Sequence, residues 1–127
     1  MKRICLVAAL ACFTTAAQAA NPGEISGPEL RKVVAGKTVY LSTSGIVLPI
    51  SYRSNGTMRG RLQAFAAALA GGKPVDSGRW WINKNQLCQR WNRWLDSKSY
   101  CYKLRRQGQQ VVWLRNDGRR GTARIGG

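Results

Sequence analysis

The chain has 127 residues, of which 21 are Lys or Arg and five are Asp or Glu; it contains no histidine, and its formal net charge is +16. The absence of histidine removes the commonest general base and the commonest metal ligand, which excludes a catalytic triad of the usual form. The sequence also lacks a phosphate-binding loop, a dinucleotide fingerprint and a zinc-type spacing. We therefore expect a protein without enzyme activity, catalytic residues, cofactor or metal.

Residues 1–19 have the pattern of a Sec-type signal peptide. A short basic start precedes an apolar run at 4–13, and an A-x-A cleavage sequence ends at Ala19. The run is too short for a membrane span, which needs about 20 apolar residues. A lipoprotein signal at Cys12 is the weaker alternative, because alanine stands three residues before that cysteine, where leucine is usual. Cleavage near Ala19 predicts a periplasmic or secreted protein with a net charge of +14.

Residues 20–35 are expected to form a lead-in and one short helix, and residues 36–127 a single β-rich domain. Ser26 and Glu29 have the spacing of a capping box, in which each side chain satisfies a free backbone N–H at the start of a helix. Gly36 suits the end of this helix. The lead-in thus predicts a helix of two to three turns ahead of the first strand.

Short β-rich runs alternate with turn signals beyond residue 36. The alanine-rich run 63–70 favours a helix by propensity, but we expect a strand there because the meander needs a partner. Pro49 lacks a backbone N–H, which indicates an edge strand or a bulge at that point, and the basic run 119–125 indicates a closing strand at an edge. The pattern predicts a mainly β fold, in which an antiparallel meander closes into a small barrel or sandwich after one short N-terminal helix.

Cys88 and Cys101 remain after signal cleavage and lie on two β-rich runs that a polar turn at 95–98 joins. If the runs pair antiparallel about this turn, the two cysteines lie opposite each other, roughly 4.5–5.5 Å apart, as a disulfide requires. An oxidising compartment preserves such a bond, so two unconnected thiols are the weaker alternative. A bridge over a loop of this size contributes on the order of 3 kcal/mol.

Alternation along this hairpin predicts which side chains face the core. The expected core side holds Leu87, Gln89, Trp91, Tyr100, Tyr102 and Leu104. Of the adjacent Trp80 and Trp81, one should face the core and the other should not.

Arginines and tryptophans are interleaved around the hairpin, in an arrangement that suits stacking on sugars or bases and clamping an anion. The candidate binding face consists of Arg90, Arg93, Trp94, Lys103 and Arg105. Alternatively, the tryptophans only pack the core, since they bury large apolar areas.

Four short motifs follow an NG pair at 55–56: G-x-W at 78–80, LC-x-x-W at 87–91, CY at 101–102 and DG at 117–118. In this order and spacing, over roughly residues 36–125, the chain resembles a family of small exported bacterial proteins classed as a domain of unknown function. The resemblance implies an exported β-rich domain with a cysteine pair, and it implies no activity. The chain departs from the family in being unusually basic.

The net charge far exceeds the roughly 2–8 charges of an ordinary small soluble domain, so the chain attracts polyanions. We expect an exported, non-enzymatic domain that binds an anionic component of the cell envelope: a phosphate, a lipid or a glycan. Export of the protein argues against nucleic acid as its binding partner. The alternatives are a small inhibitor or accessory protein that binds another protein, and a solvated basic surface without a dedicated partner.

Overall fold

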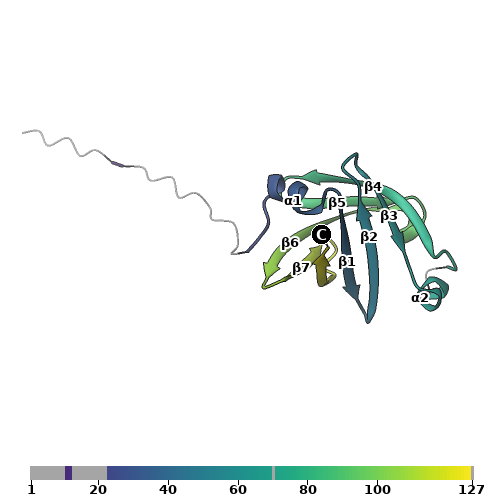
Figure 1. The fold of residues 1–127 in the computed structure, drawn as a ribbon. Helices are drawn as coiled ribbons and strands as arrows, with labels where there is room; N and C mark the ends of the chain where they lie inside the picture. Colours follow the sequence, from purple (N-terminus) through teal and green to yellow (C-terminus); the bar gives the residue numbers. More distant parts are fainter. Residues whose placement is uncertain (1–10, 13–22, 70, 127) are drawn as a thin grey trace, which may run out of the picture.

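The computed structural model describes residues 11–12, 23–69 and 71–126, so the predicted signal peptide lies outside the described residues except at positions 11 and 12. In the described part, eight antiparallel strands form a closed barrel (Figure 1). The strands are β1 (Lys37–Thr43), β2 (Ile46–Tyr52), β3 (Thr57–Arg61), β4 (Val75–Asn83), β5 (Gln86–Trp91), β6 (Ser99–Gln107), β7 (Gln110–Arg115) and β8 (Arg120–Ile125). Each strand pairs with the next along the chain, which confirms the predicted small barrel.

Strand β8 pairs with β1 and closes the barrel, with Leu41 opposite Ala123. The expectation that β2 and β8 are edge strands is therefore wrong, because each has a partner on both sides. Pro49 has no N–H to donate, and it lies just outside the β2–β3 ladder, which begins at Ile50. A strand inside the closed sheet thus accommodates Pro49, because the missing N–H lies outside the β2–β3 ladder.

The predicted hairpin is confirmed. Cys88 lies directly opposite Cys101 in the β5–β6 ladder, and the two form a disulfide. The core-facing set is also confirmed: its members are buried, except Tyr100, which is partly buried. Trp80 is buried and Trp81 is 37% exposed, as alternation along β4 predicts.

The barrel interior is a packed core. Its side chains include Ile50, Met58, Trp91 and Trp113, all buried. The internal cavity beside Tyr52 has a volume of about 20 Å³, which is room for about one water molecule. The interior beside Tyr52 therefore leaves little room for a ligand.

Helix α1 (Gly27–Val34) packs against β1, β4 and β5 and covers one end of the barrel (Figure 1). Leu30 and Val34 are fully buried in the common core, so the lead-in packs with the barrel. The prediction of a capping box is wrong. The Ser26 side chain makes no cap hydrogen bond, and Glu29 instead accepts a hydrogen bond from Arg106 on β6.

Helix α2 (Ala64–Leu69) lies at the opposite end of the barrel in Figure 1, between β3 and β4. The expectation of a strand over 63–70 is wrong, because β3 pairs directly with β4 and leaves no place for another strand. The helix propensity of alanine then decides the local structure. Neither described helix is long and apolar enough to cross a membrane.

Candidate functional site: an outer cationic face and its groove

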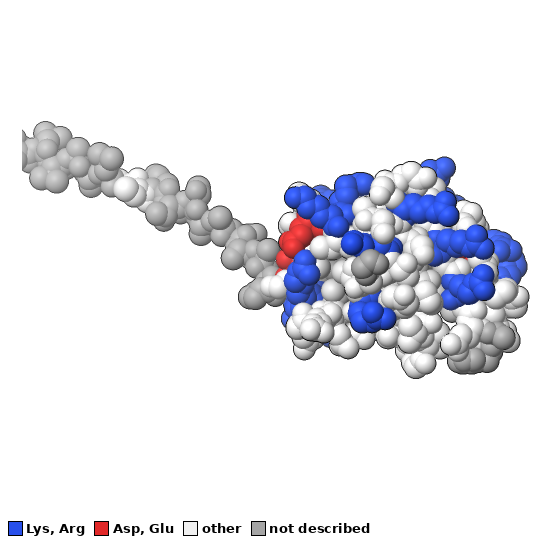
Figure 2. Space-filling model, viewed as in Figure 1, with Lys and Arg blue, Asp and Glu red and all other residues white. Residues whose placement is uncertain are grey.

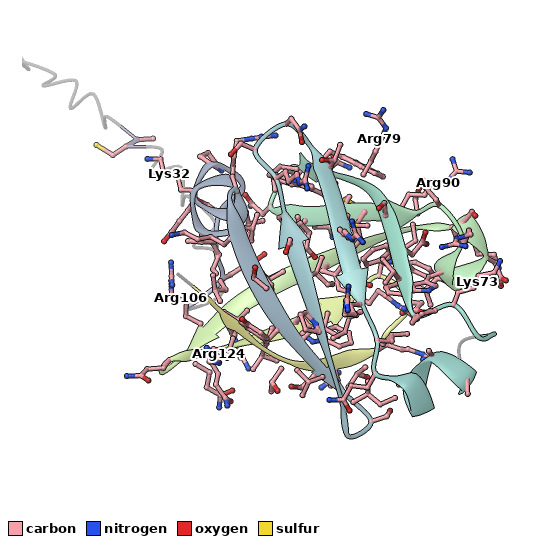
Figure 3. The ribbon with its side chains drawn as sticks, turned by 45° about the vertical axis from the view of Figure 1, so that its right-hand side comes forward. Lys32, Lys73, Arg79, Arg90, Arg106 and Arg124 are labelled. Carbon is pink, nitrogen blue, oxygen red and sulfur yellow. A yellow bond between two sulfur atoms is a disulfide. The ribbon has the colours of Figure 1, made fainter. Side chains whose placement is uncertain are left out.

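The predicted binding residues Arg90, Lys103 and Arg105 are exposed on the outside of the neighbouring strands β5 and β6. Arg79 on β4 lies directly opposite Arg90, and both side chains project away from the barrel on the same side in Figure 3. We call Arg79, Arg90, Lys103 and Arg105 the outer cationic face. Like charges directly opposite each other in a sheet are destabilising, so the Arg79–Arg90 pair does not serve the fold.

The outer cationic face carries uncompensated charge. The ion pairs between described residues join Arg93 to Asp76, Arg106 to Glu29 and Arg115 to Asp117. None of these pairs includes a residue of the outer cationic face. On the side of the molecule that Figure 2 shows, Lys and Arg are spread over the surface, while acidic residues gather mainly near the end where the chain enters the barrel.

Trp94 does not belong to this face, and its place in the candidate site is wrong. It follows β5 in a short turn (Trp94–Ser97), is 8% exposed, and packs against Trp91 with ring centroids 4.7 Å apart. Its indole Nε1–H donates to the carbonyl oxygen of Lys73. Trp94 is therefore a core residue at the end of β5.

Arg93 is committed to a structural contact. Its guanidinium lies 3.5 Å from Asp76 and donates to the carbonyl oxygen of Val75. Asp76 is 3% exposed and accepts the backbone N–H groups of Arg93 and Trp94, each at 2.8 Å. Burial alone would raise the pKa of Asp76, but the hydrogen bonds from these backbone amides outweigh it and hold the pKa below its ordinary value. Asp76 thus anchors the turn after β5.

A groove of about 540 Å³ runs along the outside of β6 and β7. We define the groove by the side chains Glu24, Lys103, Arg105, Val112, Leu114 and Arg120. Lys103, Leu114 and Arg120 form one row across β6, β7 and β8, and Arg105 lies opposite Val112 in the next row. Leu114 therefore lies between cations on both neighbouring strands, whereas Val112 lies between Arg105 on β6 and Thr122 on β8.

The chain before α1 supplies the rim of the groove beside β6. Beyond Tyr102 this side of β6 has no partner in β5, and residues 23–25 take that place. The N–H of Ile25 donates to Leu104, and the N–H of Arg106 donates to Gly23. Glu24 then lies opposite Arg105 and adds one carboxylate to the rim.

Sequence reasoning missed Val112, Leu114 and Arg120. Leu114 is 39% exposed although its neighbours Trp113 and Arg115 are buried. The alternation of β7 contained the signal, because an inward Trp113 requires an outward Leu114. The sequence alone does not show the strand register that places Leu114 between Lys103 and Arg120.

Comparison of the chain with models of known protein families, with curated proteins and with solved structures finds no match. Among the described residues, no group of three or more Cys, Asp or Glu side chains could hold a metal ion.

Proposed function

We propose that the protein is an exported, non-enzymatic domain that binds an anionic component of the cell envelope through its outer cationic face. The observation that carries this proposal is the uncompensated charge on adjacent strands, where Arg79 and Arg90 lie directly opposite each other without an acidic partner. A surface of one sign attracts ligands of the other and raises their local concentration. The packed interior supports a binding site on the outside.

The proposal of export rests on the signal-peptide pattern of residues 1–19 and on the resemblance to exported bacterial proteins described above. The disulfide between Cys88 and Cys101 is compatible with it, because disulfides persist in oxidising compartments. The anionic partner is then one that the cell envelope presents: a phosphate, a lipid headgroup or an acidic glycan.

The test is retention of the protein on lipopolysaccharide, anionic vesicles and heparin across a salt series. A variant with Arg90, Lys103 and Arg105 changed to Gln should lose retention at physiological salt. We expect a loss of roughly tenfold or more, because each basic residue near an anionic surface contributes about 1 kcal/mol.

The matched control changes Lys32, Arg53 and Lys84 to Gln. These side chains are also exposed and lie outside the outer cationic face, so the net charge falls equally. Retention of the control close to that of the unchanged protein supports a localised site. Equal losses in both variants would mean that only the net charge matters, which contradicts the proposal.

The second candidate function is binding of another protein, and the turn after β5 favours it. Leu95, Asp96 and Ser97 all have left-handed backbone conformations, with φ of 53°, 56° and 58°. Such a conformation costs an ordinary residue about 1–2 kcal/mol and persists only where the surroundings impose it. Leu95 at its tip is 42% exposed.

Both sides of this turn are fixed. Ser97 Oγ donates to the carbonyl oxygen of Asn92 at 2.6 Å, and Asp76 holds the backbone of Arg93 and Trp94. A rigid loop with an apolar tip loses little entropy when it docks, which is typical of inhibitor loops. If the protein binds another protein through this turn, that binding should be insensitive to salt. Leu95→Asp should then abolish it and leave retention on heparin unchanged.

A further inference from the structure

We infer that the groove on β6, β7 and β8 binds the phosphate headgroup of an anionic lipid, with the first part of the lipid's hydrocarbon on Val112 and Leu114. This inference rests on the proposed function and narrows its anionic partner to a lipid. A volume of about 540 Å³ lies within the roughly 300–1,000 Å³ of ordinary small-molecule sites.

The charges suit a phosphate. Lys103 and Arg120 flank Leu114 in one row, so their backbones are separated by two strand spacings, about 10 Å. Both have long flexible side chains that can converge on one group above Leu114, and Arg105 adds a third cation from the next row. Neither Lys103, Arg105 nor Arg120 takes part in an ion pair between described residues. A phosphate with several acceptor oxygens can satisfy all three cations at once.

The apolar floor suits a lipid rather than a free anion. Leu114 is 39% exposed between two cations and offers hydrocarbon an apolar contact directly beside them. Val112 is partly buried beside it and extends the apolar strip along β7. Covering this strip with hydrocarbon removes apolar area from water, worth about 25 cal/mol per Å². A phosphate without a hydrocarbon part cannot cover the strip, so its binding gains none of this free energy.

Other anions fit the groove less well. The floor is aliphatic, whereas bases and sugars stack on aromatic rings, and Trp113 on the same strand points inward and is buried. An acidic peptide could bind by adding a strand, but β7 already pairs with both β6 and β8, so its backbone groups are not free for a further strand. The lipid headgroup is the ligand class that uses both the cations and the floor.

The experiment is co-sedimentation of the protein, produced from the full chain, with phosphatidylcholine vesicles that do or do not contain phosphatidylglycerol. We expect binding only to vesicles with phosphatidylglycerol. The pair Lys103→Gln and Arg120→Gln should weaken it roughly tenfold or more. The pair Lys32→Gln and Arg53→Gln, with the same loss of charge away from the groove, should change it less than about threefold.

A second pair of variants tests the apolar floor. Leu114→Ser should weaken vesicle binding severalfold and leave retention on heparin unchanged, because heparin has no hydrocarbon to cover the floor. Val47→Ser is the matched control, since Val47 is exposed on β2 and does not line the groove. Circular dichroism of each variant verifies the fold, and Val112→Thr replaces Leu114→Ser if the latter is unfolded.

The outcomes separate this inference from the proposed function. Binding to heparin without binding to phosphatidylglycerol vesicles overturns the lipid inference and leaves the anion-binding proposal intact. Competition by glycerol 3-phosphate at the same concentration as the lipid identifies a free phosphate as the ligand and also overturns it. Unchanged vesicle binding of the Leu114→Ser variant also overturns the lipid inference. Absence of binding to every anionic probe overturns both.

Discussion

The buried carboxylate of Asp76 accepts the backbone N–H of Trp94 at a distance of 2.8 Å. This contact joins β4 to the turn after β5 and directs the chain inward just where strand alternation would point Trp94 outward. The same carboxylate accepts the N–H of Arg93 and pairs with its guanidinium. One acidic residue thus pairs with the exposed Arg93, holds Trp94 in the core and fixes the turn that presents Leu95.

Asp76→Asn should destabilise the fold. The amide has one oxygen instead of two and no charge to attract the guanidinium of Arg93, so the hydrogen bonds to Arg93 and Trp94 cannot all remain. We expect a loss of about 1–3 kcal/mol in the free energy of unfolding, measured by urea denaturation. Asp96→Asn, at an exposed carboxylate of the same turn, is the control and should change the stability by less than about 0.5 kcal/mol. An unchanged midpoint for Asp76→Asn would show that the anchor is dispensable.

Stability should fall at acid pH. Hydrogen bonds from Arg115 lower the pKa of Asp117 to about 2, and amide hydrogen bonds, acting against burial, lower the pKa of Asp76. A carboxylate whose pKa is lower in the folded than in the unfolded chain stabilises the fold above the unfolded value, about 3.9. This stabilisation is lost as pH falls through the folded pKa, so Tm should drop between about pH 4 and about pH 2. Asp117→Asn should make the drop shallower, and a flat Tm over that range would contradict the assignment.

The disulfide should be present in the purified protein. Its mass should be about 2 Da lower than that of the dithiol, because each S–S bond replaces two S–H bonds. The double variant Cys88→Ser with Cys101→Ser should lose on the order of 3 kcal/mol in the free energy of unfolding, because the unfolded chain gains freedom. In protein from which residues 1–19, with Cys5 and Cys12, have been cleaved, two alkylatable thiols would show that the bridge does not form.

Gly60→Ala should also destabilise the barrel. A Cβ at position 60 would lie 2.7 Å from the Trp94 ring and 2.8 Å from the Trp91 ring, closer than carbon atoms approach. Overpacking of this kind costs about 1–3 kcal/mol, measured by urea denaturation. Arg59→Ala, at the exposed neighbour on β3, is the control and should stay within about 0.5 kcal/mol. Equal effects of the two changes would place position 60 outside the tight contact.

The alternation of apolar and polar side chains along the strands predicted most of the fold. Period-two patterns placed Leu87, Gln89 and Trp91 in the core and set Cys88 opposite Cys101, because side chains on one strand face must share one environment. The pattern could not identify closure, since contact between β1 and β8 depends on the curvature of the whole sheet. It therefore left barrel and sandwich open and mistook β8 for an edge.

The inclusion of Trp94 in the candidate site has an identifiable cause. Strand alternation continued beyond β5 would point Trp94 outward, but β5 ends at Trp91. The contact that ends the outward alternation comes from Asp76, a residue distant in sequence, so no local pattern contained it. The groove was missed for a similar reason, because the row from Lys103 through Leu114 to Arg120 exists only once three strands are in register.

The central claim is that the outer surface of the barrel holds the anion, with a lipid headgroup in the groove on β6, β7 and β8. Backbone amide chemical shifts, followed by NMR during titration with a short-chain phosphatidylglycerol, test it most directly. We predict that the largest shifts cluster at Lys103, Val112, Leu114 and Arg120. Shifts that cluster at the Leu95 turn, or that spread evenly around the barrel, would contradict the account.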